Sequence, residues 1–351
     1  MNDSEYFAIG LMSGTSLDGL DICYVRFSHT AAWSFEIIYC ETIPYSAEWE
    51  EGLKNAIYIP SQDLLKLNVD FGFYLGEVTK TFIEKYGITK LDLIASHGHT
   101  IFHQPEKGFT LQIGDGRAVR SKTDKTVVYD FRSQDVLLGG NGAPLVPIGD
   151  ELLFSGYDAC LNLGGFSNIS MNREGKRLAF DICPVNIVLN DWAMRLDLKF
   201  DNEGALARSG NTNPHLLERL NNIPYYHQRA PKSLGIEWVN SEIKSLIAHE
   251  KPEDALATLT AHAAIQIADV LNRYHIQNVL ITGGGAYNRF LIESVQNLTN
   301  TQINIPDRTI IEYKEALIFA FMGVLRSRNL INVLSSATGS VRDHSSGLIC
   351  N

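Results

Sequence analysis

Three glycine-rich segments hold small residues that suit phosphate chemistry. Residues 10–19 read Gly-Leu-Met-Ser-Gly-Thr-Ser-Leu-Asp-Gly, and glycine and hydroxyl residues at the end of an apolar run let a backbone approach a polyphosphate. Residues 162–169, Asn-Leu-Gly-Gly-Phe-Ser-Asn-Ile, repeat this pattern. Residues 282–288, Thr-Gly-Gly-Gly-Ala-Tyr-Asn, suit close contact with a nucleoside. For the first segment alone an ordinary β-hairpin stays open, and no Gly-Lys-Ser/Thr follows as in a Walker A loop.

One carboxylate stands at the end of an expected strand, Asp181 in the sequence Ala-Phe-Asp-Ile-Cys-Pro-Val-Asn. Such strand ends face the ligand in α/β folds. A carboxylate there can accept a proton from an attacking hydroxyl or water. A helix N-cap or a structural aspartate is the alternative, and the residues alone do not decide between them.

A second polar group follows another expected strand, where residues 96–103 read Ser-His-Gly-His-Thr-Ile-Phe-His. No Asp, Glu or Cys set accompanies the histidines, so we predict sugar contacts or a structural cluster and no metal site. We expect the segment 112–116 and the Asp-Phe-Arg at 130–132 to lie at strand ends, on the same side of the sheet as these histidines. Arg132 suits a substrate carboxylate because a guanidinium forms paired hydrogen bonds, and a salt bridge with Asp130 or Asp135 is the equal alternative.

The elements that would position these groups come in two similar sets. Strands are expected at 7–13, 21–27 and 35–42, with helices at 47–57 and 64–86 for which Ser61 is the N-cap; later come strands at 159–163, 167–172 and 177–181 and a helix at 185–196. The other expected elements are strands at 91–96, 110–113, 127–131, 279–282 and 302–305 and helices at 115–123, 287–297 and 314–327.

A β-β-β-α opening that occurs twice indicates two α/β domains, each with a hairpin able to bind phosphate. We expect residues 1–136 to form the first domain, with the C-terminal tail as a candidate for completing it. Residues 137–351 form the second, which carries helical insertions. The Gly- and Pro-rich stretch 138–147 is the expected crossover.

Composition excludes several classes of protein. A chain of 351 residues favours two domains, and its formal net charge of −10 argues against a general nucleic-acid binder. No run approaches the roughly 18 apolar residues of a membrane span, and the N-terminus lacks signal-peptide character, so we expect a cytoplasmic protein. The scattered cysteines indicate reduced thiols. They are Cys23, Cys40, Cys160, Cys183 and Cys350.

Taken together, the motifs resemble the anhydro-N-acetylmuramic acid kinase family. In order, the similar runs are residues 10–21, 96–100, 112–116, 130–132, 139–147, 162–169, 231–235 and 283–288. The resemblance implies the fold of the sugar kinase, actin and heat-shock chaperone superfamily: two ribonuclease H-like domains with ATP and Mg²⁺ in the cleft between them.

The resemblance also implies the reaction. Family enzymes open the 1,6-anhydro ring of anhydro-N-acetylmuramic acid with water and phosphorylate O6, giving N-acetylmuramic acid 6-phosphate in cell-wall recycling. Asp181 would activate the water. The implied ATP contacts are Ser13, Gly14, Thr15, Ser16, Leu17, Asp18, Gly19, Asp21, Gly164, Gly165, Asn168, Gly283, Gly284, Gly285 and Asn288. The implied contacts to the small-molecule amino sugar are His97, His103, Asp115, Arg132, Asn186 and Glu315. A homodimer is an open alternative to a monomer.

The chain departs from the family pattern at two places. The usual Phe-Asp-Thr-Gly-Pro-Gly-Asn is here Phe-Asp-Ile-Cys-Pro-Val-Asn at 180–186, and His99 replaces the usual Gln of a Gly-Gln-Thr motif. Both changes are expected near the sugar. The alternatives are therefore a kinase for a different amino sugar, with Asp181 deprotonating a sugar hydroxyl, or an ATP-gated sensor or chaperone on the same fold.

Overall fold

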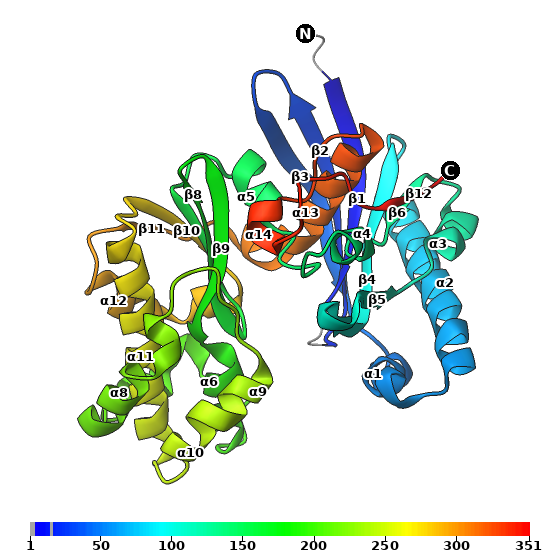
Figure 1. The fold of residues 1–351 in the computed structure, drawn as a ribbon. Coiled ribbons are helices and arrows are strands. Elements are labelled where there is room, and N and C mark those ends of the chain that lie inside the picture. Colours follow the sequence, from blue (N-terminus) through cyan, green and yellow to red (C-terminus); the bar gives the residue numbers. More distant parts are fainter. Residues whose placement is uncertain (1–3, 15–16) are drawn as a thin grey trace. The chain divides into compact units, whose positions relative to one another are not determined.

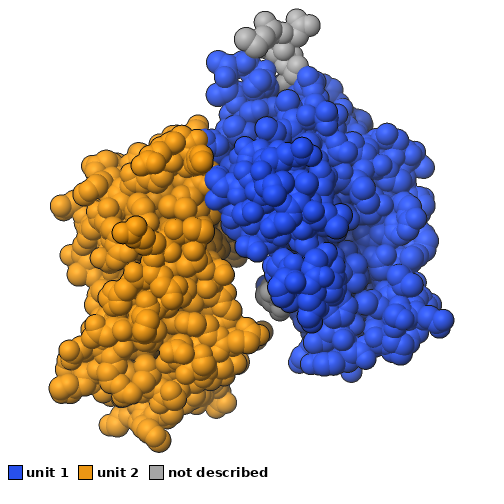
Figure 2. All heavy atoms as spheres, viewed as in Figure 1, with its two compact units in different colours: residues 1–153, 313–351 blue, residues 154–312 orange. Residues whose placement is uncertain are grey.

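The chain divides into two compact units, shown in different colours in Figure 2. The computed structural model describes residues 4–14 and 17–351. Unit 1 comprises Met1–Leu153 and Tyr313–Asn351, and unit 2 comprises Phe154–Glu312. The division thus follows Leu153 and not residue 136, and the stretch 138–147 belongs to unit 1 because it packs against the C-terminal tail, with Asn141 N–H donating to Thr338 O.

Unit 1 is an α/β unit built on one sheet (Figure 1). Its strands are β1 (Ser4–Ser13), β2 (Leu20–His29), β3 (Trp33–Ile43), β4 (Leu93–Gln104), β5 (Phe109–Ile113), β6 (Val127–Tyr129) and β12 (Leu348–Cys350). Its helices are α1 (Ala47–Asn55), η1 (Ala56–Tyr58), α2 (Ser61–Lys85), η2 (Pro105–Lys107), α3 (Gly116–Thr123), α4 (Ser133–Leu137), α5 (Pro147–Leu153), α14 (Ser335–Thr338) and α13 (Arg308–Ser327), which begins in unit 2.

The strand order in the described part of unit 1 is β3-β2-β1-β4-β6-β12, with β5 beside β4. β1 runs antiparallel to β2 and parallel to β4, and β4 runs parallel to β6. Ala8, Ile9 and Leu11 of β1 have no exposed surface, as expected for a central strand covered on both faces. The tail strand β12 pairs antiparallel with β6 and so completes this sheet.

Helices cover both faces of β1 because its side chains alternate. Ile9 and Leu11 join one apolar cluster with Phe71 and Leu75 of α2. The opposite face meets α13, whose backbone comes so close that a Cβ on Gly10 would lie 1.9 Å from the Ala316 carbonyl oxygen. Only glycine fits at this position.

Unit 2 repeats the sheet and adds helices. Its strands are β7 (Ala159–Leu163), β8 (Phe166–Arg173), β9 (Lys176–Pro184), β10 (Asn278–Thr282) and β11 (Gln302–Asn304). Its helices are α6 (Asn186–Met194), η3 (Asn202–Gly204), α7 (Ala205–Ser209), α8 (Pro214–Asn221), η4 (Pro224–His227), α9 (Ile236–Trp238), η5 (Val239–Ile243), α10 (Lys244–Ile247), α11 (Pro252–Arg273), η6 (Gly284–Tyr287) and α12 (Arg289–Gln296).

The strand order of unit 2, β9-β8-β7-β10-β11, matches β3-β2-β1-β4-β6 of unit 1 in sequence order and in direction. The expected duplication of a ribonuclease H-like unit is therefore confirmed. α11 packs against this sheet through a nearly continuous apolar surface that includes Leu256, Leu259, Ile267 and Leu271. No helix in the described ranges has the length and apolar character needed to cross a bilayer.

Several expected elements have different bounds. β4 continues to Gln104, since residues 99–104 pair with β5, so the histidines lie within the strand and not after it. β9 continues to Pro184 because it stays paired with β8. The N-cap of α2 is Pro60, and Ser61 is the first helical residue.

Gly10→Ala should destabilise the protein, because its Cβ would collide with the α13 backbone. Overpacking typically costs about 1–3 kcal/mol. Gly52→Ala in α1 is the control: its Cβ meets nothing within 4 Å, and alanine in a helix adds about 0.5–1 kcal/mol relative to glycine. Urea denaturation compares the two. A Gly10→Ala midpoint at or above the wild-type value would contradict the close packing.

Candidate functional site

A row of polar side chains crosses one end of the unit 2 sheet. Thr282 pairs with Asn162, Asn162 with Asn168, and Asn168 with Asp181. Directly paired residues of neighbouring strands project to the same face, so these four side chains lie in line. An extra residue in β9, Ile182, shifts the β8–β9 register and keeps Asp181 in the row.

Sequence reasoning finds Asp181 and Asn168 of this row but misses Asn162 and Thr282 as site residues. The signal was present, because each is a polar residue near the end of an otherwise apolar strand. The Thr282 hydroxyl oxygen is buried without a hydrogen-bond partner. A buried polar atom in that state points to a ligand or water as its partner.

Asp181 is held by the segment that follows η4. Its Oδ2 accepts a hydrogen bond of 2.8 Å from the Leu234 N–H, and its backbone N–H donates to Lys232 O at 3.0 Å. The Tyr225 hydroxyl donates to the Asp181 carbonyl oxygen at 2.8 Å. Desolvation raises the pKa of the half-buried carboxyl, and the Leu234 N–H opposes that rise. The carboxylate is thus fixed at one oxygen and more basic than usual.

The glycine segments of unit 2 converge on Leu163. A Cβ on Gly283, whose φ is +82°, would lie 2.5 Å from Asn162 Oδ1 and 2.8 Å from Leu163 O. A Cβ on Gly285 would lie 2.7 Å from the Leu163 Cβ. The Asn186 amide at the start of α6 donates to Leu163 O at 3.1 Å. The two segments and Asn186 therefore form one corner with room only for glycine at these positions.

The same corner fixes the start of α6. The N–H groups of Val185 and Ile187 donate to Gly165 O at 2.8 and 3.1 Å, and the Asn186 N–H donates to Gly164 O at 3.2 Å. The structure therefore brings Gly164, Gly165 and Asn186 together, as expected. Gly284 lies at the same place, with its Cβ position 3.8 Å from Asn186 Nδ2.

The residues beside Asp181 that differ from the family pattern have buried side chains. Ile182, Cys183 and Val185 are all buried in the apolar core of unit 2. The Cys183 N–H donates to Ser167 Oγ at 3.1 Å, and burial raises the pKa of its thiol to about 12. These bulkier residues pack into the core of unit 2 next to Asp181, and the expectation that they lie near the sugar stays a prediction.

The first glycine segment of unit 1 rests on a buried polar relay. The Tyr45 hydroxyl donates to Ser13 Oγ at 2.6 Å, and Ser13 Oγ lies 2.9 Å from His99 Nδ1. Burial lowers the pKa of His99, so its ring is neutral at neutral pH, and either the Ser13 hydroxyl or the His99 Nδ1–H donates in this bond. The buried His99 thus supports the first glycine segment through Ser13, whose hydroxyl already has Tyr45 and His99 as partners within the protein.

The rest of this segment is a tight connection from β1 to β2. Leu17 has a φ of +61°, its N–H donates to Gly14 O at 3.4 Å, and a Cβ on Gly19 would lie 2.5 Å from Ile43 O. Asp18 is exposed, and Oδ1 of Asp21 accepts from Thr42 at 2.6 Å. Thr15 and Ser16, also expected to contact ATP, lie outside the described residues.

Three of the expected sugar contacts, His97, His103 and Glu315, interact with a fourth, Arg132, in unit 1. Arg132 Nε donates to Nε2 of the buried His97 at 2.8 Å, and His97 Nδ1 lies 2.9 Å from Gly98 O. Burial and the Arg132 charge hold the pKa of His97 well below its ordinary value. Glu315 is exposed on α13, yet desolvation raises the pKa of its carboxyl, which the Arg132 charge lowers. Burial and Arg132 also lower the pKa of His103.

This geometry determines the protonation states of His97 and Arg132. A carbonyl only accepts, so His97 Nδ1 carries the proton and Nε2 accepts from Arg132. Desolvation lowers the pKa of Arg132 to about 10, so the guanidinium stays charged at neutral pH. No direct salt bridge with Asp130 or Asp135 is among its contacts in the described structure. The result is a fixed cation beside a neutral histidine.

Two expected ligand contacts serve as helix N-caps. Asp115 Oδ1 accepts from the Arg117 N–H at 2.8 Å, and the Arg117 guanidinium also binds this buried carboxylate and lowers its pKa. Asn288 Oδ1 accepts from the Leu291 N–H at 3.0 Å at the start of α12. Their roles as ligand contacts stay predictions. Over the ranges described, no three His, Cys, Asp or Glu side chains cluster as metal ligands.

Comparison with known proteins places the chain among relatives of one kind. A family model described as anhydro-N-acetylmuramic acid kinase matches residues 6–351. The anhydro-N-acetylmuramic acid kinase of Francisella tularensis subsp. novicida is 33% identical, with 96% of this chain and 97% of that protein covered. The protein of that name from Haemophilus influenzae is 32% identical, with 99% of each covered. A solved ROK family glucokinase from Streptomyces griseus, in complex with glucose and AMPPNP, is 11% identical with a TM-score of 0.40, covering 90% of this chain and 98% of that one.

His99→Gln should reduce the loss of stability in acid. Burial lowers the pKa of His99 to about 4, against about 6.5 in an unfolded chain. Between these values the unfolded chain binds a proton that the folded protein excludes. Stability is therefore full above about pH 6.5 and falls toward about pH 4, by up to about 1.4 kcal/mol per pH unit for this group.

Urea denaturation at several pH values in this window measures the slope. Glutamine retains a hydrogen-bond acceptor for Ser13 but does not titrate, so the slope should become shallower by up to one proton. His215→Gln, at an exposed position of α8, is the control variant. An unchanged slope in His99→Gln would show that His99 is not a buried neutral group.

Proposed function

Because the chain belongs to the anhydro-N-acetylmuramic acid kinase family, we propose that it opens the 1,6-anhydro ring of anhydro-N-acetylmuramic acid with water and transfers the γ-phosphoryl group of ATP to O6. The products are N-acetylmuramic acid 6-phosphate and ADP. The observation that carries the proposal is the family match from residue 6 to residue 351, which includes both units. The alternatives are a kinase for a different amino sugar and an ATP-gated sensor or chaperone, and the family match and the named relatives favour neither.

The reaction balances with one general base. The water oxygen bonds to C1, one water proton passes to Asp181, and the C1–O6 bond breaks. O6 then bonds to the γ-phosphorus as the bond between that phosphorus and the ADP oxygen breaks. Holding both steps in one arrangement lowers the entropic part of the barrier.

The contacts of Asp181 support its role as the base. The Leu234 N–H occupies Oδ2, which fixes the carboxylate plane and leaves Oδ1 lone pairs for the water. Desolvation raises the pKa of the group and so makes it a better proton acceptor near neutral pH. Tyr225 and Lys232 hold the backbone on either side of the carboxylate in place, which keeps the base aimed at one position.

The glycine segments support ATP as the phosphoryl donor. Gly283 and Gly285 keep side chains out of a corner that a nucleotide can approach. Glycine-rich turns of the kind that the sequence has after β1 supply backbone N–H donors to phosphates. Mg²⁺ bound with ATP neutralises phosphate charge, and it usually keeps waters and needs only one or two protein carboxylates. Asp18 before β2 and Asp21 within β2 are the acidic residues next to that turn suited to this task.

Arg132 supports an acidic sugar. His97 and Gly142 O hold its guanidinium in one orientation, and its pKa keeps it charged. A fixed guanidinium binds a carboxylate through two parallel hydrogen bonds. We assign it to the carboxylate of the muramic acid side chain, with Glu315 and His103 contacting neutral groups of the sugar.

Asp181→Asn should abolish turnover and leave folding intact, because the amide keeps the shape but cannot accept the proton. Loss of a general base costs about 10²- to 10⁴-fold in kcat. Asp191→Asn in α6, a half-buried residue paired with Arg195, is the control and should keep wild-type activity. In the assay, the protein is incubated with ATP, Mg²⁺ and anhydro-N-acetylmuramic acid in ¹⁸O-labelled water, and the product is analysed by mass spectrometry. More than about a tenth of the normal kcat in Asp181→Asn would contradict this role.

Arg132→Lys should raise the KM for the acidic sugar more than the KM for ATP. Lysine keeps the charge but loses the planar pair of donors, and its shorter reach also weakens the bond to His97. Steady-state kinetics with each substrate varied in turn gives both constants. Equal effects on the two KM values would indicate that Arg132 only stabilises the fold of unit 1.

A further inference from the structure

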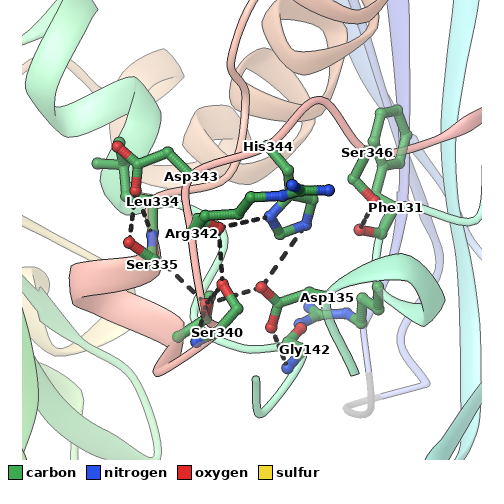
Figure 3. A network of polar contacts seen from close by, with 12 residues as sticks. Phe131, Asp135, Gly142, Leu334, Ser335, Ser340, Arg342, Asp343, His344 and Ser346 are labelled. Carbon is green, nitrogen blue, oxygen red and sulfur yellow. Dashed lines mark hydrogen bonds and ion pairs between the residues drawn. The ribbon is translucent and has the colours of Figure 1, made fainter. Parts of the chain in front are cut away.

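A buried carboxylate beside Arg132 lies outside the proposed reaction. Asp135 of α4 has no exposed surface. Its Oδ2 accepts from the Gly142 N–H at 2.7 Å (Figure 3). Its Oδ1 accepts from the Thr338 hydroxyl at 2.7 Å. His344 Nε2 lies 3.6 Å from Oδ1. Two of these three partners come from the C-terminal tail, which is more than 200 residues away in the sequence.

These contacts fix the conformation of the loop after α4. The N–H of Gly140 donates to Asp135 O at 2.9 Å, and the N–H of Asn141 donates to Thr338 O at 2.8 Å. Gly142 has a φ of +69°, and a Cβ on Gly140 would lie 2.2 Å from Asp135 Oδ2. The loop is therefore closely packed between α4 and the C-terminal tail.

The loop in turn holds Arg132. The Gly142 residue whose N–H binds Asp135 uses its carbonyl oxygen to accept from Arg132 Nη1 at 2.6 Å. A chain of hydrogen bonds thus leads from Thr338 through Asp135 and Gly142 to Arg132, and on to His97. A guanidinium has five N–H groups, and these two bonds use two of them, which leaves three for a ligand.

We infer that Asp135, together with Thr338 of the C-terminal tail, is a positioning residue that aims Arg132 at the carboxylate of an anionic substrate. The inference rests on the proposed function for the identity of that substrate. Asp135 does not touch the sugar, because it is fully buried. It acts through residue Gly142, whose backbone N–H donates to Asp135 and whose backbone carbonyl oxygen accepts from Arg132.

The negative charge of Asp135 explains why the C-terminal tail contributes to this hydrogen-bond network. A buried carboxylate is costly unless donors satisfy both oxygens. The Gly142 N–H satisfies Oδ2, so Oδ1 depends on the Thr338 hydroxyl of the tail. Without the Thr338 hydroxyl, Asp135 must move to find another donor, and Gly142 and Arg132 move with it. Asp135 also favours the charged form of Arg132 electrostatically.

The test uses Thr338→Val, which keeps the shape of the side chain and removes the hydroxyl. Its KM for anhydro-N-acetylmuramic acid should rise about 3- to 30-fold, which lies within the range of coupling between neighbouring residues, while its KM for ATP changes by less than about twofold. The control is Ser335→Ala. Ser335 donates to Asp343 at 2.6 Å within the same tail but does not reach Asp135, so its constants should match wild type (Figure 3).

A double-mutant cycle separates positioning from a general loss of structure. In an Arg132→Lys background, Thr338→Val should add less than about twofold to the sugar KM, because the residue it positions is already changed. Additive effects in the double variant would overturn the inference. So would a Thr338→Val enzyme with wild-type constants for both substrates.

A second readout needs no sugar. The ¹⁵N-edited signal of the Arg132 Nε–H, identified by its loss in Arg132→Lys, should exchange with solvent faster in Thr338→Val than in Ser335→Ala. Identical exchange in the two variants would overturn the inference. If wild-type protein fails to convert anhydro-N-acetylmuramic acid, the proposed function fails, but this exchange measurement still decides whether Asp135 and Thr338 position Arg132.

Discussion

The central strands of both units are buried on both faces, and this constraint determines where chemistry can occur. β1 and β7 carry almost only apolar residues along their length, because a polar side chain there would lose its water without gaining a partner. Polar residues are tolerated only where the strands end. Ser13, Asn162 and Thr282 all stand at such ends, and the glycine segments begin immediately after them. The same burial that stabilises each sheet therefore concentrates the functional groups at one edge.

The polar groups near those edges are kept in a single state by their neighbours. His97 and His99 stay neutral because burial lowers the pKa of each ring, and each ring nitrogen that contacts a neighbour is hydrogen-bonded, His97 to Arg132 and His99 to Ser13. Arg132 stays charged because its pKa is still about 10. Asp181 keeps one oxygen bound to a backbone N–H. Groups held in this way need little rearrangement when substrates bind, which is the condition for effective electrostatic catalysis.

Much of this arrangement could be predicted from the sequence, because it depends on local patterns. The alternation in β1, β7 and β8 and the glycines after them indicated a duplicated unit, and the strand orders confirm it. The fate of Ile182, Cys183 and Val185 could not be predicted, because a bulge in β9 decides which side chains face the core. The role of Asp135 was equally hidden. Its partner Thr338 is brought to it by a tail that carries no strong motif of its own.

The return of the C-terminal tail to the first unit has a consequence for how the chain is made. Unit 2 is one continuous segment, Phe154–Glu312, whereas the sheet of unit 1 is closed by β12, three residues that end at Cys350. Proteins leave the ribosome from the N-terminus, at about 5–20 residues per second. The unit that is translated second is thus complete first, and the residues around Arg132 gain the contact with Thr338 only after all of unit 2 has been made. A translation product interrupted directly after unit 2 would contain a finished second unit and an open edge at β6, the type of edge that invites pairing with other chains.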